Sequence, residues 1–383
     1  MDEKERCEMS DYFGKDVFKL GFGLMRLPKL KDGKTIDVEQ TSRMVDLFLE
    51  AGGTYFDTAY VYDDGRSEET IREALVKRYP RESYTLCTKL CAWLQCHDEK
   101  SAKQQFYTSL ERTQAGYFDY YLLHALKAEN YKKYDEYHIW DFVKEQKKKG
   151  LIKYFGFSYH ADPKLLDRIL SEHPEVDFIQ LQLNYADWEN PGIASRENYE
   201  VARKHGKSIT VMEPVKGGAL ANPIPDVKKI FDEANPNTSY ASWAIRYVAS
   251  LEGIITVLSG MSDIFQMEDN LSYMKDFKPL SDEEQAAIRR AQFAMEQSDS
   301  IKCTGCHYCT GGCPERIPIP EIFSDCNEEI VYGNHDKGQE MYDKATAHGG
   351  KASACIKCMQ CESACPQHLP VTELLEKAVS MFE

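Results

Sequence analysis

Long apolar runs, a signal peptide and an excess of basic residues are all absent from this sequence. No stretch of about 18 apolar residues occurs, and the first residues, MDEKERCEMSDYFGKD, are charged and contain no apolar segment. Lys and Arg number 47 against 62 Asp and Glu, which gives a formal net charge of −15. Such a charge disfavours binding to the phosphates of nucleic acids and of anionic membranes. We therefore expect a soluble cytoplasmic protein with no nucleic-acid or membrane partner.

Cysteine, by contrast, is plentiful, with 13 in 383 residues. In a chain without an export signal, this number indicates reduced thiols that bind metal rather than a disulfide framework. Two runs of four cysteines match each other, CTGCHYCTGGCP at 303–314 and CIKCMQCESACP at 355–366. Among the remaining cysteines we interpret Cys7, Cys87 and Cys326 as small apolar residues.

Short apolar runs rich in β-forming residues alternate with longer amphipathic runs over much of the chain. Eight strands are predicted, at 17–23, 55–59, 84–90, 118–124, 152–158, 178–184, 207–213 and 253–259. Helical spacing lies between them, as in VEQTSRMVDLFLEAG, which ends near Gly52 as a helix with a glycine C-cap would. Eight strand–helix units in series predict an α/β fold, a (β/α)8 TIM barrel. An open doubly wound sheet is the alternative, but GFGLMRLP at the first strand lacks a glycine-rich phosphate-binding fingerprint.

The pattern changes after residue 275. KPLSDEEQAAIRRAQFAMEQ predicts a helix that has Ser281 as its N-cap and acidic residues in its first turn. The segments 321–333 and 337–350, between the cysteine runs, also read as helical. We therefore divide the chain into a barrel at 1–280 and a mostly α-helical domain at 281–383.

Both cysteine runs have the spacing C-x-x-C-x-x-C-x-x-x-C-P. This spacing is typical of bacterial two-cluster ferredoxins, in which the fourth cysteine of each run binds the other cluster. The predicted ligands are Cys303, Cys306, Cys309 and Cys365 for one 4Fe-4S cluster, and Cys355, Cys358, Cys361 and Cys313 for the other. Zinc also binds paired C-x-x-C units, but two matching runs closed by Pro favour iron–sulfur clusters. With its helical spacer, this domain resembles the α-helical ferredoxin modules of multi-centre oxidoreductases.

Polar residues gather at the ends of the predicted strands, where a barrel of this kind carries its chemistry. They are Asp57, Lys89, His124, Ser158, Gln180, Asn184 and Glu213, and Tyr62 lies in the loop after Asp57. Four of these residues form a set that could act on a carbonyl group. Tyr62 would donate a proton, with its pKa lowered by the charge of Lys89, and Asp57 would pair with Lys89. His124 would orient or polarise the substrate oxygen.

Residues from about 17 to 276 resemble the aldo-keto reductase family. The matching pieces are GFGLMRLP, FDTAYVYDDGRSEE, TKL, YFDYYLLHAL, GLIKYFGFS, FIQLQLNY and EDNL. The resemblance implies a (β/α)8 barrel and NAD(P)H-dependent carbonyl reduction by an Asp, Tyr, Lys and His tetrad. These roles fall on Asp57, Tyr62, Lys89 and His124.

The resemblance also implies a cofactor site, with departures from the family pattern. Ser158 and Gln180 stand where the family holds the nicotinamide carboxamide, and Met212 stands where an aromatic residue stacks on the ring. At the adenosine end, the family's Lys, Ser and Arg for a 2′-phosphate align with Gly260, Met261 and Gln266, followed by Asp269 and Asn270. The loss of two cations favours NAD(H) over NADP(H). Lys216, Gly217 and Gly218 follow the seventh strand, where a barrel commonly binds phosphate, and could equally hold the phosphate of FMN.

Three hypotheses about function follow. The leading one is an iron–sulfur oxidoreductase that acts on a small carbonyl or alcohol substrate and relays electrons through two 4Fe-4S clusters. A flavin could join two-electron to one-electron steps, and a ferredoxin or flavoprotein could be the electron partner. The second hypothesis is an NAD(H)-dependent carbonyl reductase whose clusters are structural or redox-sensing. The third is a redox-sensing interaction subunit, against which the presence of all four tetrad residues argues.

Overall fold

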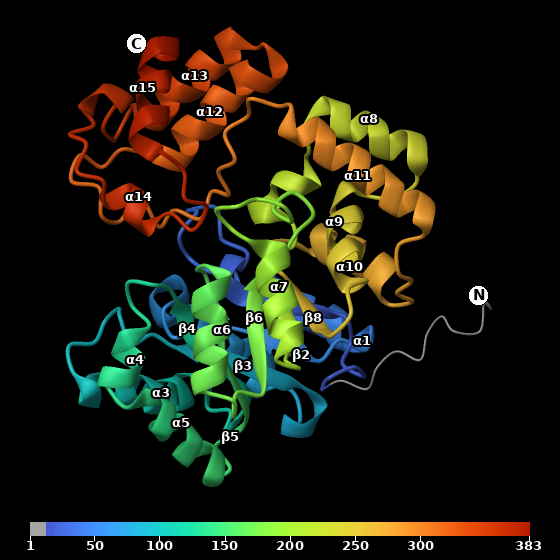
Figure 1. The fold of residues 1–383 in the computed structure, drawn as a ribbon, viewed down its shortest axis with the longest axis vertical. Coiled ribbons are helices and arrows are strands. Elements are labelled where there is room, and N and C mark those ends of the chain that lie inside the picture. Colours follow the sequence, from blue (N-terminus) through green and yellow to red (C-terminus); the bar gives the residue numbers. More distant parts are fainter. Residues whose placement is uncertain (1–12) are drawn as a thin grey trace. The chain divides into compact units, whose positions relative to one another are not determined.

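The computed structural model describes residues 13–383, so Cys7 lies outside the described residues. Eight parallel strands close into a barrel in which β1 pairs with β2 and with β8 (Figure 1). The strands are β1 (Leu20–Gly23), β2 (Tyr55–Asp57), β3 (Thr85–Leu90), β4 (Phe118–Leu126), β5 (Ile152–Tyr159), β6 (Phe178–Gln182), β7 (Ser208–Met212) and β8 (Ile254–Ser259). All eight predicted strands are present, in sequence order, so the prediction of a TIM barrel is confirmed.

Burial on both faces explains why these strands read as continuous apolar runs. Every residue of β4 is buried, and so is every residue of β8. Parallel strands in a barrel have helices outside and packed side chains inside, so neither face needs polar residues. The alternation of polar and apolar residues that marks a half-exposed strand is therefore missing.

Helices connect the strands of the barrel. They are α1 (Val38–Glu50), α2 (Arg66–Ile71), α3 (Glu99–Thr113), α4 (Lys132–Glu136), α5 (Ile139–Lys148), α6 (Pro163–Glu172), α7 (Ser195–Lys204), α9 (Tyr240–Ala249) and α10 (Ile264–Met274). Short 3-10 turns lie at Leu24–Arg26, Tyr62–Gly65, Arg81–Ser83, Lys216–Ala221 and Ala352–Ala354, and a π turn lies at Arg72–Val76. In α1 the carboxylate of Asp37 caps the first turn by accepting from the Gln40 amide, and Met44, Val45 and Phe48 are buried. The helix is followed by Gly52 at φ +92, the left-handed conformation expected from the sequence.

The rest of the chain adds a second set of helices. They are α8 (Pro225–Ala234), α11 (Asp282–Glu296), α12 (Ile319–Tyr332), α13 (His335–Thr346), α14 (Gln360–Ala364) and α15 (Val371–Phe382). The predicted helix after Ser281 is α11, and Ser281 and Glu284 cap it reciprocally. The two helices predicted between the cysteine runs are α12 and α13, which pack against each other, and α12 also packs against α15 (Figure 1). Ile322, Phe323, Tyr342, Leu375 and Phe382 are among the residues of their common core.

The chain divides into two compact units. Within residues 13–383, the first contains residues 13–189, Ala194–Pro214 and Ser242–Leu280, and the second contains Asn190–Ile193, Val215–Ala241 and Ser281–Glu383. The second unit therefore includes the loop after β7 and helix α8 as well as residues 281–383, and the predicted division into two domains at residue 280 stays a prediction. Within residues 13–383 no helix is long and apolar enough to cross a membrane.

Candidate active site and cysteine cavities

A buried ion pair lies at the carboxyl ends of β2 and β3. Asp57 is the last residue of β2, and Lys89 is the next-to-last residue of β3 and has no exposed surface. The Lys89 ammonium pairs with the Asp57 carboxylate and donates to the Thr58 carbonyl at 2.7 Å. Burial favours the neutral amine, but the Asp57 carboxylate and Tyr62 outweigh burial, so the pKa of Lys89 lies above its ordinary value. Lys89 is therefore a fixed positive charge at the barrel mouth.

Tyr62 lies beside this ammonium. The Lys89 Nζ atom is 4.5 Å from the centroid of the Tyr62 ring, and the His124 ring is edge-on to the same ring at 5.7 Å between centroids. Burial raises the pKa of Tyr62, the Lys89 charge acts against this increase, and the Asp57 carboxylate adds to it. The expected effect of Lys89 on Tyr62 is thus present, but burial is larger, so the net pKa is raised and Tyr62 stays protonated at neutral pH.

A tight loop presents Tyr62. Asp63 and Asp64 have φ values of +53 and +56, and Gly65 has φ +88, so three successive residues adopt the left-handed conformation. Asp tolerates this conformation better than most residues, and Gly has no Cβ to strain. A Cβ atom at position 65 would lie 2.5 Å from the Arg112 guanidinium carbon. The sequence YDDG therefore fits this loop.

His124 is held by its backbone and has a buried ring. Its carbonyl oxygen accepts from Trp93 Nε1 at 3.0 Å and from the Tyr134 hydroxyl at 2.6 Å. Burial, followed by the charges of Lys89 and His160, keeps the pKa of His124 well below its ordinary value. The ring is therefore neutral at neutral pH, and its buried Nδ1 atom has no hydrogen-bond partner among the described residues.

Strand β4 bulges directly after His124. The register between β4 and β5 shifts between Leu123 and Leu126, and Ala125 has φ +53. The Ala125 amide donates to the Ser158 hydroxyl at 2.7 Å. Bulges of this kind re-aim side chains beside active sites. Ser158, a predicted carboxamide ligand, thus also braces the strand that carries His124.

A buried carboxylate that the sequence analysis missed supports this region. Glu68 has no exposed surface and accepts from the Thr88 hydroxyl at 2.7 Å and from Arg112 at 3.2 Å. Arg112 also donates to the Tyr60 carbonyl at 3.0 Å, two residues before Tyr62. The sequence around Glu68 carries no local signal of its burial. Glu68 and Arg112 therefore fix the loop that presents Tyr62.

The other predicted cofactor residues lie in several different environments. Gln180 donates to the Asp57 carboxylate at 3.2 Å, so it joins the tetrad. Asn270 donates to the Ser259 hydroxyl at 2.9 Å. Gln266 is exposed, and its side chain bonds to Ser262 and Asp263 at the start of α10. Met212 and Asp269 are half-buried, and Met261 is 1% exposed.

The predicted phosphate loop after β7 belongs to the second compact unit. Gly217 and Gly218 have φ values of +65 and +101, and a Cβ atom at position 217 would lie 2.0 Å from the Thr304 carbonyl oxygen. Lys216 is 3% exposed, and its ammonium donates to the Gln367 side-chain oxygen at 2.9 Å. Both contacts are to residues inside the cysteine motifs or directly beside them. The prediction of phosphate binding by this loop stays a prediction.

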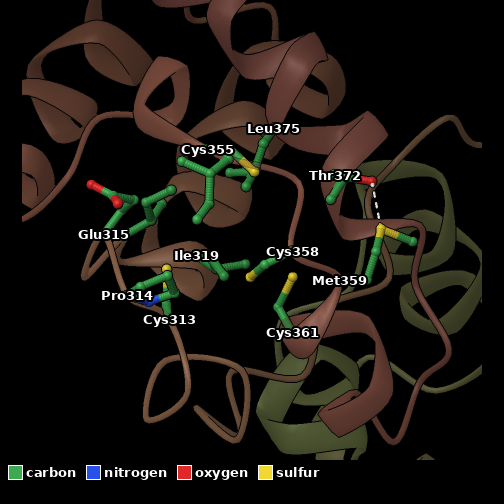
Figure 2. A pocket seen from close by; sticks show the side chains of 12 residues that line it. Cys313, Pro314, Glu315, Ile319, Cys355, Cys358, Met359, Cys361, Thr372 and Leu375 are labelled. Atoms are coloured by element: carbon green, nitrogen blue, oxygen red, sulfur yellow. Dashed lines mark hydrogen bonds between the residues drawn. The ribbon is translucent and has the colours of Figure 1, made fainter.

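Each cysteine run contributes to two cavities. One, which we call the first cavity, is lined by Cys303, Cys306, Cys309 and Cys365. The other, the second cavity, is lined by Cys313, Cys355, Cys358 and Cys361 (Figure 2). Each cavity thus takes three cysteines from one run and the last cysteine of the other run. Their empty volumes, with the open space at the mouth included, are about 330 and 320 Å³.

The chemistry of these cavities fits a 4Fe-4S cluster. In each set four soft thiol ligands line one cavity. Burial raises the pKa of Cys303 to about 11; the Gly305 amide acts against this rise, and the thiols of Cys306 and Cys365 add to it. Four thiolates that line one cavity would repel one another, and the iron of a bound cluster would supply the compensating positive charge.

The barrel with its Asp, Tyr, Lys and His set and the eight cysteines define the class of protein. Residues 19–292 match the aldo/keto reductase family, and residues 295–366 match the 4Fe-4S dicluster domain. The chain belongs to the aldo/keto reductase family and is an oxidoreductase of that type, followed by a 4Fe-4S dicluster domain whose two cysteine runs hold eight cysteines.

Three relatives show how far the likeness extends. An uncharacterised oxidoreductase of Bacillus subtilis is 24% identical over 303 residues, which cover 72% of this chain and 92% of the relative. The holo form of an aldo-keto reductase from Bacillus halodurans is 26% identical with a TM-score of 0.58, covering 73% of this chain and 95% of that one. An aldo/keto reductase from Klebsiella pneumoniae in complex with NADP and acetate is 20% identical with a TM-score of 0.59, covering 72% and 91%. The fold is therefore shared over the barrel.

Proposed function

We propose that this protein catalyses redox chemistry on a small carbonyl or alcohol substrate at the barrel mouth and relays electrons through two 4Fe-4S clusters. The observation that carries the proposal is the presence of two complete sites in one chain. One is the buried Asp57–Lys89 pair with Tyr62 and His124. The other is the pair of four-cysteine cavities.

At the barrel mouth, Tyr62 is the acid that gives a proton to a carbonyl oxygen during reduction, or accepts one during alcohol oxidation. The ammonium of Lys89 stabilises the phenolate that results, because it lies 4.5 Å from the ring centroid in a buried setting. Asp57 keeps that ammonium in place. Neutral His124 offers its ring to the substrate oxygen as a hydrogen-bond donor.

For the clusters, we propose crossed ligation. Cys303, Cys306, Cys309 and Cys365 hold the first cluster, and Cys355, Cys358, Cys361 and Cys313 hold the second. Each cluster supplies a one-electron carrier when bound. A hydride is worth two electrons, so two carriers match the stoichiometry of one substrate turnover. A ferredoxin or a flavoprotein is the proposed electron partner.

For the nicotinamide we propose NAD(H) rather than NADP(H). The Klebsiella relative is bound to NADP, but here the aligned positions are Gly260, a buried Met261, and Gln266, whose side chain bonds to Asp263. None of these is a cation. The test compares kcat/KM for NADH and NADPH. A preference for NADPH would contradict the proposal and direct attention to Arg26, whose side chain lies 3.5 Å from the Cβ position of Gly260.

FMN is an additional proposed cofactor, because a flavin handles both hydride and one-electron steps. The Lys216 loop was its predicted phosphate site. Acid release of a yellow chromophore from protein purified without air, identified by mass, supports the proposal. A full set of clusters with no releasable flavin contradicts it.

The relay is tested by anaerobic purification, measurement of iron and sulfide, and addition of NADH. Bleaching of the cluster absorption together with a paramagnetic signal supports electron transfer from the barrel to the clusters. The matched variants are Tyr62→Phe, which removes the acid, and Tyr60→Phe, which alters a neighbouring tyrosine whose ring stacks on Arg112. We expect carbonyl reduction to fall by about 10²–10⁴-fold in Tyr62→Phe and to be retained in Tyr60→Phe, with nicotinamide binding intact in both.

The second candidate is an NAD(H)-dependent carbonyl reductase with structural or sensing clusters. It is favoured by one observation: the barrel relatives match about 72% of this chain and cover 91–95% of their own length, so they align without the dicluster region. Under this candidate, clusters already reduced by dithionite leave the rate of carbonyl reduction unchanged. Under the leading proposal the rate of carbonyl reduction changes, because the two clusters that relay electrons are then already reduced.

A further inference from the structure

The first cavity is lined by a glutamine amide as well as by cysteines. Gln367 lies two residues after Cys365, is 9% exposed, and contributes to the wall of the first cavity. Its side-chain nitrogen is a buried atom that has no hydrogen-bond partner among residues 13–383. A buried amide N–H left in this state costs free energy unless something in the cavity accepts from it.

Lys216 determines which end of that amide faces the cavity. The ammonium of Lys216 can only donate, so the atom it bonds at 2.9 Å is the amide oxygen. The amide nitrogen is therefore the end left for another partner. Lys216 is 3% exposed, so its charge is poorly screened by solvent. Lys216 reaches this position because the loop after β7 packs its Gly217 against the Thr304 backbone.

The second cavity has a different residue at the matching position. Glu315 lies two residues after Cys313, is exposed, and lines the second cavity beside Cys313 (Figure 2). A carboxylate brings negative charge and no donor, whereas Gln367 brings a donor backed by a buried cation. The two cysteine runs are alike in spacing, but the two cavities are electrostatically unlike.

Other charges act in the same neighbourhood. Glu321 lies near Cys303 and adds negative charge to the first cavity, but His307 lies 3.7 Å from it and both side chains are about half exposed. Near the second cavity, Lys357 is paired with Glu376. The Lys357–Glu376 pair is exposed, so solvent screens it. One carboxylate oxygen of Glu321 is buried, so Glu321 opposes the positive charge of Lys216, and it does so in the wild type and in the Gln367 variants alike.

We propose that Gln367 and Lys216 raise the reduction potential of the cluster in the first cavity above that of the cluster in the second. Gln367 donates its side-chain N–H to a sulfur of the first cluster, and Lys216 holds the amide in that orientation and adds positive charge. Hydrogen bonds to sulfur and local net charge are two of the factors that set the potential of such clusters. The inference rests on the proposed crossed ligation, and it makes the first cluster the one that is reduced first.

The test is an anaerobic potentiometric titration of the full chain, followed by electron paramagnetic resonance. Cys303→Ser identifies the signal of the first cluster. We expect Gln367→Leu to lower the equilibrium constant for reduction of that cluster by about tenfold, which is about 59 mV for a one-electron couple. Gln367→Glu lowers it further, because it exchanges the donor for a charge. Lys216→Met acts in the same direction, and its effect is smaller when Leu already stands at 367, since Lys216 works partly through the amide.

The matched control is Glu315→Gln, which changes the corresponding position of the second cavity. We expect it to leave the potential of the first cluster unchanged and to raise that of the second. Equal shifts of both clusters in Gln367→Leu would overturn the inference, because they would report a general loosening of the domain. An unchanged first potential in both Gln367→Leu and Lys216→Met, with about eight irons per chain, would also overturn it and leave the proposed function standing. Fewer irons in the wild-type chain, by contrast, would overturn the proposed ligation itself.

Discussion

Replacing Lys89 by Met tests the buried pair at the centre of the proposed active site. Asp57 is 3% exposed, and after the substitution its carboxylate would keep only the 3.2 Å hydrogen bond from Gln180 among the contacts described above. Breaking a buried ion pair by removal of one partner costs about 3–5 kcal/mol, because an uncompensated charge is left behind. Each kcal/mol shifts Tm by about 2–4 °C in domains of 150–250 residues. We therefore expect the barrel of Lys89→Met to melt roughly 6–20 °C below that of the wild type.

The double variant Lys89→Met with Asp57→Asn separates stability from catalysis. Removal of both charges takes away the uncompensated carboxylate, and replacing a buried ion pair by neutral groups is often close to neutral in stability. We therefore expect the double variant to recover most of the lost Tm. Carbonyl reduction should remain lost in both variants, because the cation that stabilises the Tyr62 phenolate is missing from each.

The assay is thermal unfolding followed by circular dichroism, with NADH-dependent carbonyl reduction measured on the same samples. Iron content is measured in parallel, so that loss of clusters is not mistaken for loss of the barrel. A single variant as stable as the wild type would refute the reasoning, since Asp57 would then not need its partner. A double variant no more stable than the single one would refute it equally, because the cost would then come from packing of the Lys89 stem.

Three further predictions concern titration and ligation. The pKa of His124 is lowered well below its ordinary value, so the free energy of unfolding should fall below about pH 6.5 by about 1.4 kcal/mol per pH unit. Urea unfolding at pH 7.5 and pH 5.5 should show a smaller fall for His124→Asn than for the wild type, and an equal fall would contradict this prediction. Burial and then Glu321 raise the pKa of Asp325 to about 7, so ionisation of Asp325 lowers the free energy of unfolding progressively from about pH 4 to pH 7. Asp325→Asn should therefore be more stable than the wild type by roughly 2–4 kcal/mol at pH 8 and no more stable at pH 4. A stability difference that does not depend on pH would count against this prediction. Cys365→Ser should perturb the paramagnetic signal of the first cluster and Cys313→Ser that of the second; uncrossed ligation would give the reverse pattern.

The sequence was sufficient for the barrel because its strands carry two separate signals. GIITVLS is a nearly continuous apolar run, and FDYYLLH is apolar except for Asp119 and His124, as expected for strands buried on both faces. Helical spacing separates these runs. Eight repeats of this strand–helix unit are compatible with few chain topologies, and the closed barrel is one of them. The ends of the elements were less predictable, as shown by β4, which was predicted to stop at His124 and continues to Leu126 through a bulge.

The candidate site was predictable only where residue type and strand position agreed. Asp57, Lys89 and His124 combine ionisable side chains with strand ends, and Tyr62 follows in the adjoining loop. Glu68 was not predictable in the same way, because a glutamate on a short helix is normally solvent-exposed. Its burial depends on Arg112, 44 positions along the chain. Contacts at such separation leave no periodic trace in a single sequence.

The loop after β7 shows most clearly how tertiary structure changes an interpretation. A lysine with two glycines after the seventh strand of a barrel is typical of a phosphate site, and nothing local contradicts that interpretation. In the structure the ammonium of Lys216 bonds to Gln367, which is 151 residues away, and a side chain at position 217 would collide with the Thr304 backbone. Position 217 is therefore restricted to glycine by its contact with the first cysteine run, whether or not a phosphate also binds nearby. One short loop joined directly to a barrel strand thus bonds through its lysine to Gln367, a residue that lines the first cavity. Under the proposal above, the potential of the first cluster is therefore the property that changes in this loop should alter most.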